Sequence, residues 1–308
     1  MSTVTEGGVV ELAAVDSELA RLRGGPHGAS VRATTLNLMV YAPDPDSVSQ
    51  AERALNRIGG GRPLRALVLT PGKGKATARV SSSCWLASTG QEVCSEQVVI
   101  EADPAALPSS AVPVLVPDLP VFLLWLGPVE DVRALLEELS ELATRLIVDS
   151  DQCGIGCAES VRGLTPSLTD LAWTRLAPWR EALAALGDSP GGLRAYQRAH
   201  MLEVRGPANE AALLAGWLRS RLGRQIGLDH SARTRHLERV AVAGRAAWLS
   251  VERTGRTGVG RAVGPDGLEH PVVLPRREWA WLVAAELDRL GSDPVFEAAL
   301  AAAGDPVG

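Results

Sequence analysis

The first half of the chain alternates between apolar runs and stretches with helical spacing. Residues 31–43 are rich in β-branched and apolar side chains, which predicts a strand, and residues 46–58 repeat apolar positions at helical intervals. A second apolar run follows at residues 65–71. A strand, a helix and a strand in this order are typical of a parallel pair, so we expect a partly parallel sheet.

Two more runs, at residues 76–87 and 92–102, are separated by a glycine-containing turn and predict an antiparallel hairpin. Further along, two apolar runs predict two more strands, and the segment between them has the spacing of a helix. Residues 31–165 are therefore expected to form an N-terminal mixed α/β domain. Residues 1–30 are expected to form a flexible lead that contains one short helical pattern at residues 10–22.

The pattern changes after residue 165. Thr165 is a predicted N-terminal helix cap, and Pro166 follows it at the first helical position. Residues 167–186 have helical spacing. Beyond them, short strands alternate with glycine turns, which predicts an antiparallel meander, and an amphipathic helix follows. These features predict a C-terminal α+β domain over residues 166–308. The expected fold class is therefore α/β (α+β), with a partly parallel sheet in the first domain and an antiparallel meander plus helices in the second.

Charge is spread unevenly, although the formal net charge of the 308 residues is only −5. Residues 191–256 contain 12 arginines against 5 acidic residues, so this region carries +7 and the rest of the chain carries −12. Such a basic region is typical of a surface for an acidic partner or an anionic ligand, and the alternative is a solvated face balanced by nearby acids. The composition predicts neither a disordered chain nor a nucleic-acid-binding protein.

No leader or membrane span is predicted. The first 16 residues lack a basic segment followed by a long apolar one, and three prolines interrupt the longest apolar tract, at residues 111–127. We therefore expect a cytoplasmic protein that makes no membrane contact.

No motif predicts catalysis. The stretch PGKGKAT at residues 71–77 resembles a phosphate loop, but Leu69 and Ala76 stand where that motif requires Gly and Ser or Thr. The five histidines are scattered, and neither HExxH nor GxSxG occurs. We therefore assign no catalytic residue, no metal ligand and no cofactor.

Four cysteines leave more than one interpretation open. In a large cytoplasmic chain most cysteines are expected to be reduced thiols. Cys84 and Cys94 would face each other across the predicted hairpin, and three residues separate Cys153 from Cys157 in a polar, glycine-rich loop. The second pair is a candidate redox-responsive pair, and inert thiols are the alternative. A zinc site is not favoured, because only one pair has ligand spacing.

The segment LAWTRLAPWR, residues 171–180, places two indoles and two guanidinium groups around a proline. Pro178 has no N–H, so the helix must kink or restart there, and Arg175 is expected over the ring of Trp179. Trp and Arg dominate protein–protein hot spots, which predicts a partner-binding face, and packing of the indoles in the core is the alternative. The candidate partner-binding residues are Trp173, Arg175, Trp179, Arg180, Trp217, Arg219 and Arg221.

Four blocks, PDLPVFLLWLG, TRLIVDSD, LTDLAWTRLAPWREAL and AALLAGWLRSRLG, together resemble the glucose-6-phosphate dehydrogenase assembly protein family, OpcA. The resemblance implies a two-part bacterial protein of glucose metabolism that is not itself an enzyme. It implies that the chain binds glucose-6-phosphate dehydrogenase and promotes its assembly into the active oligomer, or its activity, in the oxidative pentose phosphate pathway. The alternative is an α/β enzyme or sensor that binds an anionic metabolite resembling a sugar phosphate.

Overall fold

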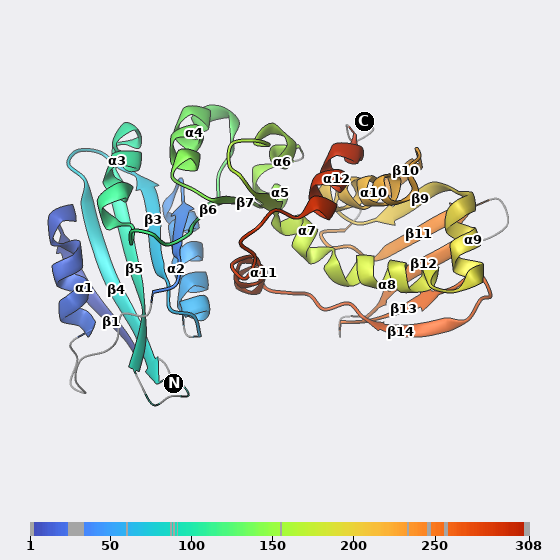
Figure 1. The fold of residues 1–308 in the computed structure, drawn as a ribbon, viewed down its shortest axis with the longest axis horizontal. Coiled ribbons are helices and arrows are strands. Elements are labelled where there is room, and N and C mark those ends of the chain that lie inside the picture. The colour runs from blue at the N-terminus through green and yellow to red at the C-terminus, as the bar shows by residue number, and fades with distance from the viewer. Residues whose placement is uncertain are drawn as a thin grey trace. The chain divides into compact units, whose positions relative to one another are not determined.

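The chain folds into two compact units, drawn in Figure 1. Unit 1 comprises Met1–Cys153, Arg162–Leu168 and Trp279–Gly291, and unit 2 comprises Gly154–Val161, Thr169–Glu278 and Ser292–Gly308. This computed structural model describes residues 3–304 except 24–33, 60, 87, 89, 91, 155, 233, 245–247 and 256–257.

An eight-stranded sheet forms the centre of unit 1, and the boundary with unit 2 falls within its last strand, β8. Its strands are β1 (Thr3–Val10), β2 (Asn37–Tyr41), β3 (Arg65–Pro71), β4 (Thr77–Leu86), β5 (Glu92–Ala102), β6 (Val121–Trp125), β7 (Arg145–Val148) and β8 (Leu168–Asp170). Their order is β1-β4-β5-β3-β2-β6-β7-β8. β2, β3, β5, β6 and β7 pair in parallel, whereas β4 runs antiparallel to β1 and β5. Every residue of β2 is buried, as expected for a parallel strand covered on both faces.

Helices cover both faces of this sheet. They are η1 (Leu12–Ala14), α1 (Val15–Arg23), α2 (Pro45–Gly59), η2 (Pro104–Ala106), α3 (Leu107–Ala111), η3 (Val112–Val114), η4 (Glu130–Val132), α4 (Arg133–Glu141), α5 (Ser150–Cys153) and α11 (Trp279–Glu286). Glu96 of β5 pairs with Arg23 of α1, and the next residue, Gln97, bonds to Glu52 of α2. Successive side chains of a strand point to opposite faces, so α1 and α2 lie on opposite sides of the sheet.

Unit 2 is built on a six-stranded sheet. Its strands are β9 (Ala199–Arg205), β10 (Gly227–Ser231), β11 (Arg239–Gly244), β12 (Trp248–Thr254), β13 (Val259–Val263) and β14 (Glu269–Val273). The order is β10-β9-β11-β12-β13-β14, and only the pair of β10 with β9 is parallel. The predicted α/β (α+β) class, with a partly parallel sheet and an antiparallel meander, is confirmed.

The helices described in unit 2 are α6 (Cys157–Ser160), α7 (Leu171–Arg175), α8 (Ala177–Gly187), α9 (Pro190–Arg198), α10 (Ala208–Leu222) and α12 (Pro294–Ala303). α8 and α9 pack against β11, β12 and β13, and α10 packs against α12. A Cβ atom on Gly216 of α10 would lie 2.0 Å from the carbonyl oxygen of Ala299, so only glycine allows this close approach. No helix in the described ranges is both long and apolar enough to cross a bilayer.

Three predicted boundaries differ from the structure. Residues 3–23 of the expected flexible lead contain β1, which was not predicted, and α1, which lies largely within the expected helical pattern, and residues 24–30 lie outside the described residues. The helix predicted over residues 167–186 begins only at Leu171, because residues 168–170 form β8, and Asp170 rather than Thr165 caps it. The units also do not divide once at residue 165, since the chain returns to unit 1 for Trp279–Gly291.

Candidate functional site

The segment LAWTRLAPWR forms α7, the single linking residue Leu176 and the start of α8. The Asp170 carboxylate accepts a hydrogen bond from the backbone N–H of Ala172 at 2.9 Å, which caps α7. Pro178 lies in the first turn of α8, where its missing N–H removes no helical hydrogen bond. The predicted restart of the helix at this proline is therefore confirmed.

The three indoles of the predicted partner-binding face are buried within unit 2. Trp173 has 0% of its surface exposed, Trp179 2% and Trp217 8%. Their burial agrees with the alternative interpretation, in which the indoles pack in the core. The physical reason is that burying a large apolar ring is more favourable than leaving it in water when a helix face already points inward. Binding of a partner by this part of the chain stays a prediction.

Guanidinium groups contact these indoles, but not in the predicted pairs. Arg180 lies 3.4 Å from the centroid of the Trp173 ring, whereas Arg175 was expected over Trp179. The guanidinium group of Arg253 lies over the Trp179 ring, 5.6 Å from its centroid. Burial lowers the pKa of Arg253 and the charge of a nearby arginine adds to the effect. The aromatic and cationic groups thus form an internal cluster of unit 2.

The other candidate arginines have different surroundings. Arg175 forms an ion pair with buried Glu210 at 3.2 Å. Arg219 donates to two carbonyl oxygens at the C-terminal end of α12, at 3.2 and 2.6 Å, where a positive charge also offsets the helix dipole. Arg221 is exposed. Only Arg221 among the seven candidates is therefore presented fully to solvent.

Asp293 joins this cluster, and sequence patterns did not single it out. The indole N–H of Trp173 donates to its carboxylate at 2.9 Å, and the carboxylate also accepts from the backbone N–H groups of Val295 and Phe296. Burial alone would raise the pKa of Asp293, but these hydrogen bonds and the charge of Arg180 hold it below its ordinary value. The only sequence signal was an Asp-Pro pair, which marks a helix start.

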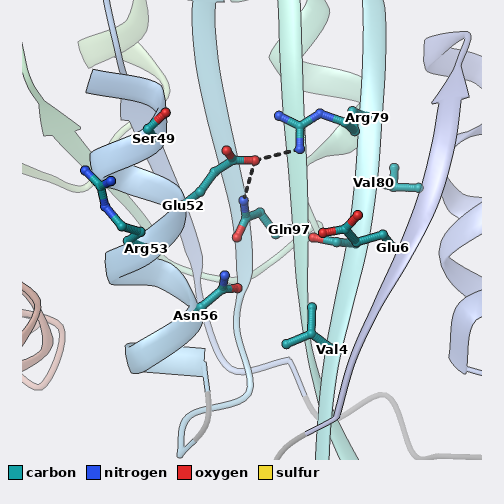
Figure 2. A pocket seen from close by; sticks show the side chains of 10 residues that line it. Val4, Glu6, Ser49, Glu52, Arg53, Asn56, Arg79, Val80 and Gln97 are labelled. Carbon is teal, nitrogen blue, oxygen red and sulfur yellow. Dashed lines mark hydrogen bonds and ion pairs between the residues drawn. The ribbon is translucent and has the colours of Figure 1, made fainter. Parts of the chain in front are cut away.

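A groove lies between α2 and strands β1, β4 and β5 of unit 1 (Figure 2). It consists of two adjoining pockets of about 320 and 430 Å³. Glu52 reaches from the helix to Arg79 at 2.7 Å and accepts from the amide of Gln97 at 3.4 Å. No sequence motif predicts this groove, because its residues come from elements far apart in the chain.

The groove is polar and has an excess of acidic groups. Four carboxylates and two guanidinium groups line it, and none of its lining residues is a histidine or a cysteine. The charged residues are Glu6, Asp44, Glu52, Glu101, Arg53 and Arg79. Such a lining can hydrogen-bond a polar group, but its net negative charge disfavours an anionic ligand.

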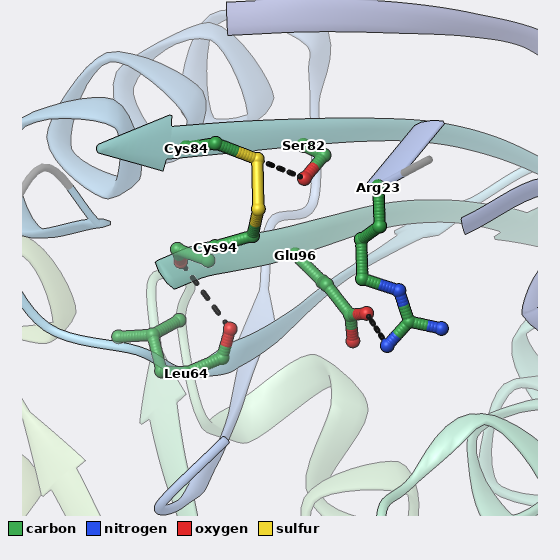
Figure 3. Close-up of a disulfide and its surroundings, with 7 residues drawn as sticks. Arg23, Leu64, Ser82, Cys84, Cys94 and Glu96 are labelled. Atoms are coloured by element: carbon green, nitrogen blue, oxygen red, sulfur yellow. Dashed lines mark hydrogen bonds and ion pairs between the residues drawn. A yellow bond between two sulfur atoms is a disulfide. The ribbon is translucent and has the colours of Figure 1, made fainter. Parts of the chain in front are cut away.

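Cys84 and Cys94 form a disulfide across the β4–β5 hairpin (Figure 3). They occupy directly opposed positions in the register, as the hairpin predicts, but the expectation of reduced thiols is wrong for this pair. The Ser82 hydroxyl lies 3.5 Å from the Cys84 sulfur. The pairing of β4 with β5 holds the two cysteines directly opposite each other, which favours the disulfide.

Cys153 and Cys157 are also disulfide-bonded, so none of the described cysteines is a free thiol. A redox response of this pair stays a prediction. Within the described ranges, no group of three or more His, Cys, Asp or Glu side chains is placed to hold a metal ion.

Two protein-family models match adjacent segments of the chain. Residues 55–164 match the model described as the glucose-6-phosphate dehydrogenase subunit N-terminal domain. Residues 166–300 match the model described as the C-terminal domain of the same subunit.

Curated relatives carry the name OxPP cycle protein OpcA. The one from Nostoc punctiforme is 32% identical over 193 residues, which cover 56% of this chain and 41% of that protein. The one from Synechococcus elongatus is 29% identical over 222 residues, covering 66% and 50% respectively. The chain thus spans about half the length of these relatives.

Among solved structures, an aldose-aldose oxidoreductase from Caulobacter crescentus superposes with a TM-score of 0.49 at 12% identity, over 87% of this chain and 94% of that one. A likeness this distant carries no conclusion about function. The two family models, in contrast, are adjacent and together extend from residue 55 to residue 300. This chain belongs to the OpcA family.

Proposed function

We propose that this chain is a cytoplasmic accessory protein that binds glucose-6-phosphate dehydrogenase and promotes its assembly into the active oligomer, or its activity. The observation that carries the proposal is the match of both subunit domains, one after the other, over residues 55–300. The name of the curated relatives places them in the OxPP cycle, which agrees with such a role.

The surroundings of the ionisable groups favour an accessory role over catalysis. In the described groove of unit 1, Glu52 is occupied by Arg79 and Gln97, and no lining histidine or cysteine is present to act as a base or nucleophile. The excess of carboxylates also disfavours the alternative, an enzyme or sensor for an anionic sugar phosphate.

An activator of this kind works by differential affinity. It must bind the competent form of the dehydrogenase more tightly than the incompetent form, because equal affinity for both forms shifts no equilibrium. A tenfold preference corresponds to about 1.4 kcal/mol. No bond-making step on this chain is required.

The test is to titrate purified chain into purified dehydrogenase and to measure oligomer mass by light scattering and initial velocity in parallel. We expect a larger oligomer or a higher velocity that saturates with the concentration of the chain. Heat-denatured chain serves as the control. An unchanged mass and velocity at saturating concentrations would contradict the proposal, as would turnover of a metabolite by the chain alone.

A further inference from the structure

Exposed arginines gather at one end of unit 2, where α9 and α10 both finish. Arg194 and Arg198 lie one helical turn apart on α9, and Arg221 and Arg224 lie in and just beyond the last turn of α10. All four side chains are exposed.

Two observations bring these helix ends together. The guanidinium of Arg224 donates to the carbonyl oxygen of Tyr196 in α9 at 2.8 Å. β9 and β10 run in parallel, and Met201 of β9 pairs with Gly227 of β10. Arg198 precedes Met201 by three residues and Arg224 precedes Gly227 by three residues, so the two arginines lie at the same end of this strand pair. The C-terminal ends of α9 and α10, which carry the four arginines that we call the arginine cluster, are therefore neighbours.

The arginine cluster is not charge-paired within the part of the chain that the structure describes. No carboxylate among the described residues forms an ion pair with any of its members, whereas Arg261, for example, pairs with both Glu252 and Glu269. Like charges four residues apart on a helix repel each other and lower its stability. Favourable interaction with the helix dipole accounts for a single arginine in a last turn, but not for four together.

The neighbouring side chains suit a protein partner. Gln197, His200 and Gln225 add hydrogen-bonding groups, and Leu193, which is 54% exposed, adds an apolar contact beside Arg194. Arginine is enriched in protein interfaces because its planar group combines apolar faces with several donors.

We propose that the arginine cluster binds an acidic surface of a partner protein. The inference rests on the proposed function, in which that partner is glucose-6-phosphate dehydrogenase. A nucleic acid is disfavoured, because the whole chain carries −5 and the cluster is confined to one end of one unit, so a long polyanion would meet repulsion elsewhere.

The experiment uses the full-length chain with the double substitution Arg194→Gln/Arg198→Gln. The matched control is Arg133→Gln/Arg261→Gln, which removes the same charge from two half-exposed arginines that are paired with carboxylates. Dissociation constants for the purified dehydrogenase are measured by biolayer interferometry at 50 and 300 mM NaCl. We expect the dissociation constant of the cluster variant to rise about tenfold at low salt with a flatter salt dependence, and that of the control to stay within about twofold.

The possible outcomes distinguish the proposed function from the proposed role of the arginine cluster. If the native chain binds the dehydrogenase and the cluster variant binds equally well, the arginine cluster is not the contact and the proposed function stands. If the native chain does not bind the dehydrogenase at all, both proposals fail. If a duplex DNA probe binds the native chain but not the variant, while affinity for the dehydrogenase is unchanged, the surface serves a polyanion instead. The thermal midpoint of the variant, expected at or above that of the native chain, checks that it is folded.

Discussion

At the scale of single residues, burial determines which charges matter for stability. Arg65 of β3 is fully buried and donates twice to buried Glu96, at 2.8 and 2.6 Å. It also donates to Asp16 of α1 and to the carbonyl oxygen of Val114, at 2.9 and 3.0 Å. Arg23 approaches the other oxygen of Glu96 at 2.9 Å, as Figure 3 shows. These hydrogen bonds and ion pairs link α1 to strands β3 and β5 of unit 1.

Replacing Glu96 by leucine is expected to lower the free energy of unfolding by about 3–5 kcal/mol, because Arg65 would keep its charge in the interior with its main partner removed. Urea denaturation of the native and variant chains measures the difference. Glu137→Leu, which removes the partner of exposed Arg133, is the control and should change stability by less than about 1 kcal/mol. Equal effects of the two substitutions would mean that burial does not strengthen the Arg65 network.

The contact between Trp173 and Asp293 predicts a specific pH dependence. Because the pKa of Asp293 is held below its ordinary value of 3.8, its ionised form stabilises the fold above that pH, and this contribution is lost as pH falls through the folded-state pKa. Trp173→Phe removes the indole donor and should cost about 1.5 kcal/mol at pH 7 from the lost hydrogen bond alone.

The thermal midpoints of the native chain and the Trp173→Phe variant should therefore differ most at neutral pH and converge below about pH 4. Differential scanning calorimetry between pH 2.5 and pH 7 measures this. A difference that stays constant across the range would show that the substitution acts through packing alone.

At the scale of elements, the β4–β5 hairpin combines local pairing with a covalent link. The disulfide joins two directly opposed strand positions that are 10 residues apart in the chain. β4 in turn carries β1 on its other side, so the hairpin supports one end of the sheet of unit 1.

Replacing both Cys84 and Cys94 by alanine is expected to lower the free energy of unfolding by about 2–3 kcal/mol, from the regained entropy of the unfolded loop. The comparison is made in a background in which Cys153 and Cys157 are also alanine, so that one disulfide remains. In that background, dithiothreitol should lower the thermal midpoint of the parent chain and leave that of the quadruple variant unchanged. A parent chain insensitive to the reductant would contradict the stabilising role.

At the scale of the whole molecule, the last part of the chain serves both units. Residues 279–291 belong to unit 1, where Glu286 pairs with fully buried Arg145 at 2.6 Å. Residues 292–308 belong to unit 2, where Asp293 and α12 pack against the core. One C-terminal segment of 30 residues therefore completes two separate cores.

A chain that ends at Glu278 should lose stability in both units, because Arg145 and Trp173 would each lose a polar partner while buried. Hydrogen exchange measured by mass spectrometry should show at least about tenfold faster exchange in both β7 and α10. A chain that ends at Gly304 is the control. Loss of protection in only one of the two units would contradict this shared role.

The sequence by itself determined most element types, though not β1 or β8, together with the two kinds of sheet and the facing cysteines of the hairpin. Apolar periodicity and turn residues act over a few positions, so they predict local structure and the number of layers. The restart of the helix at Pro178 followed from the same local chemistry.

Only the tertiary structure decided which groups are buried and which partners they meet. The pattern of LAWTRLAPWR is compatible with an exposed face or a core, and packing against α12 placed Trp173 in the core beside Asp293. The groove and the arginine cluster likewise depend on residues from separate elements. Electrostatic and packing energies depend on distance in space, and a linear sequence does not specify which distant residues become neighbours.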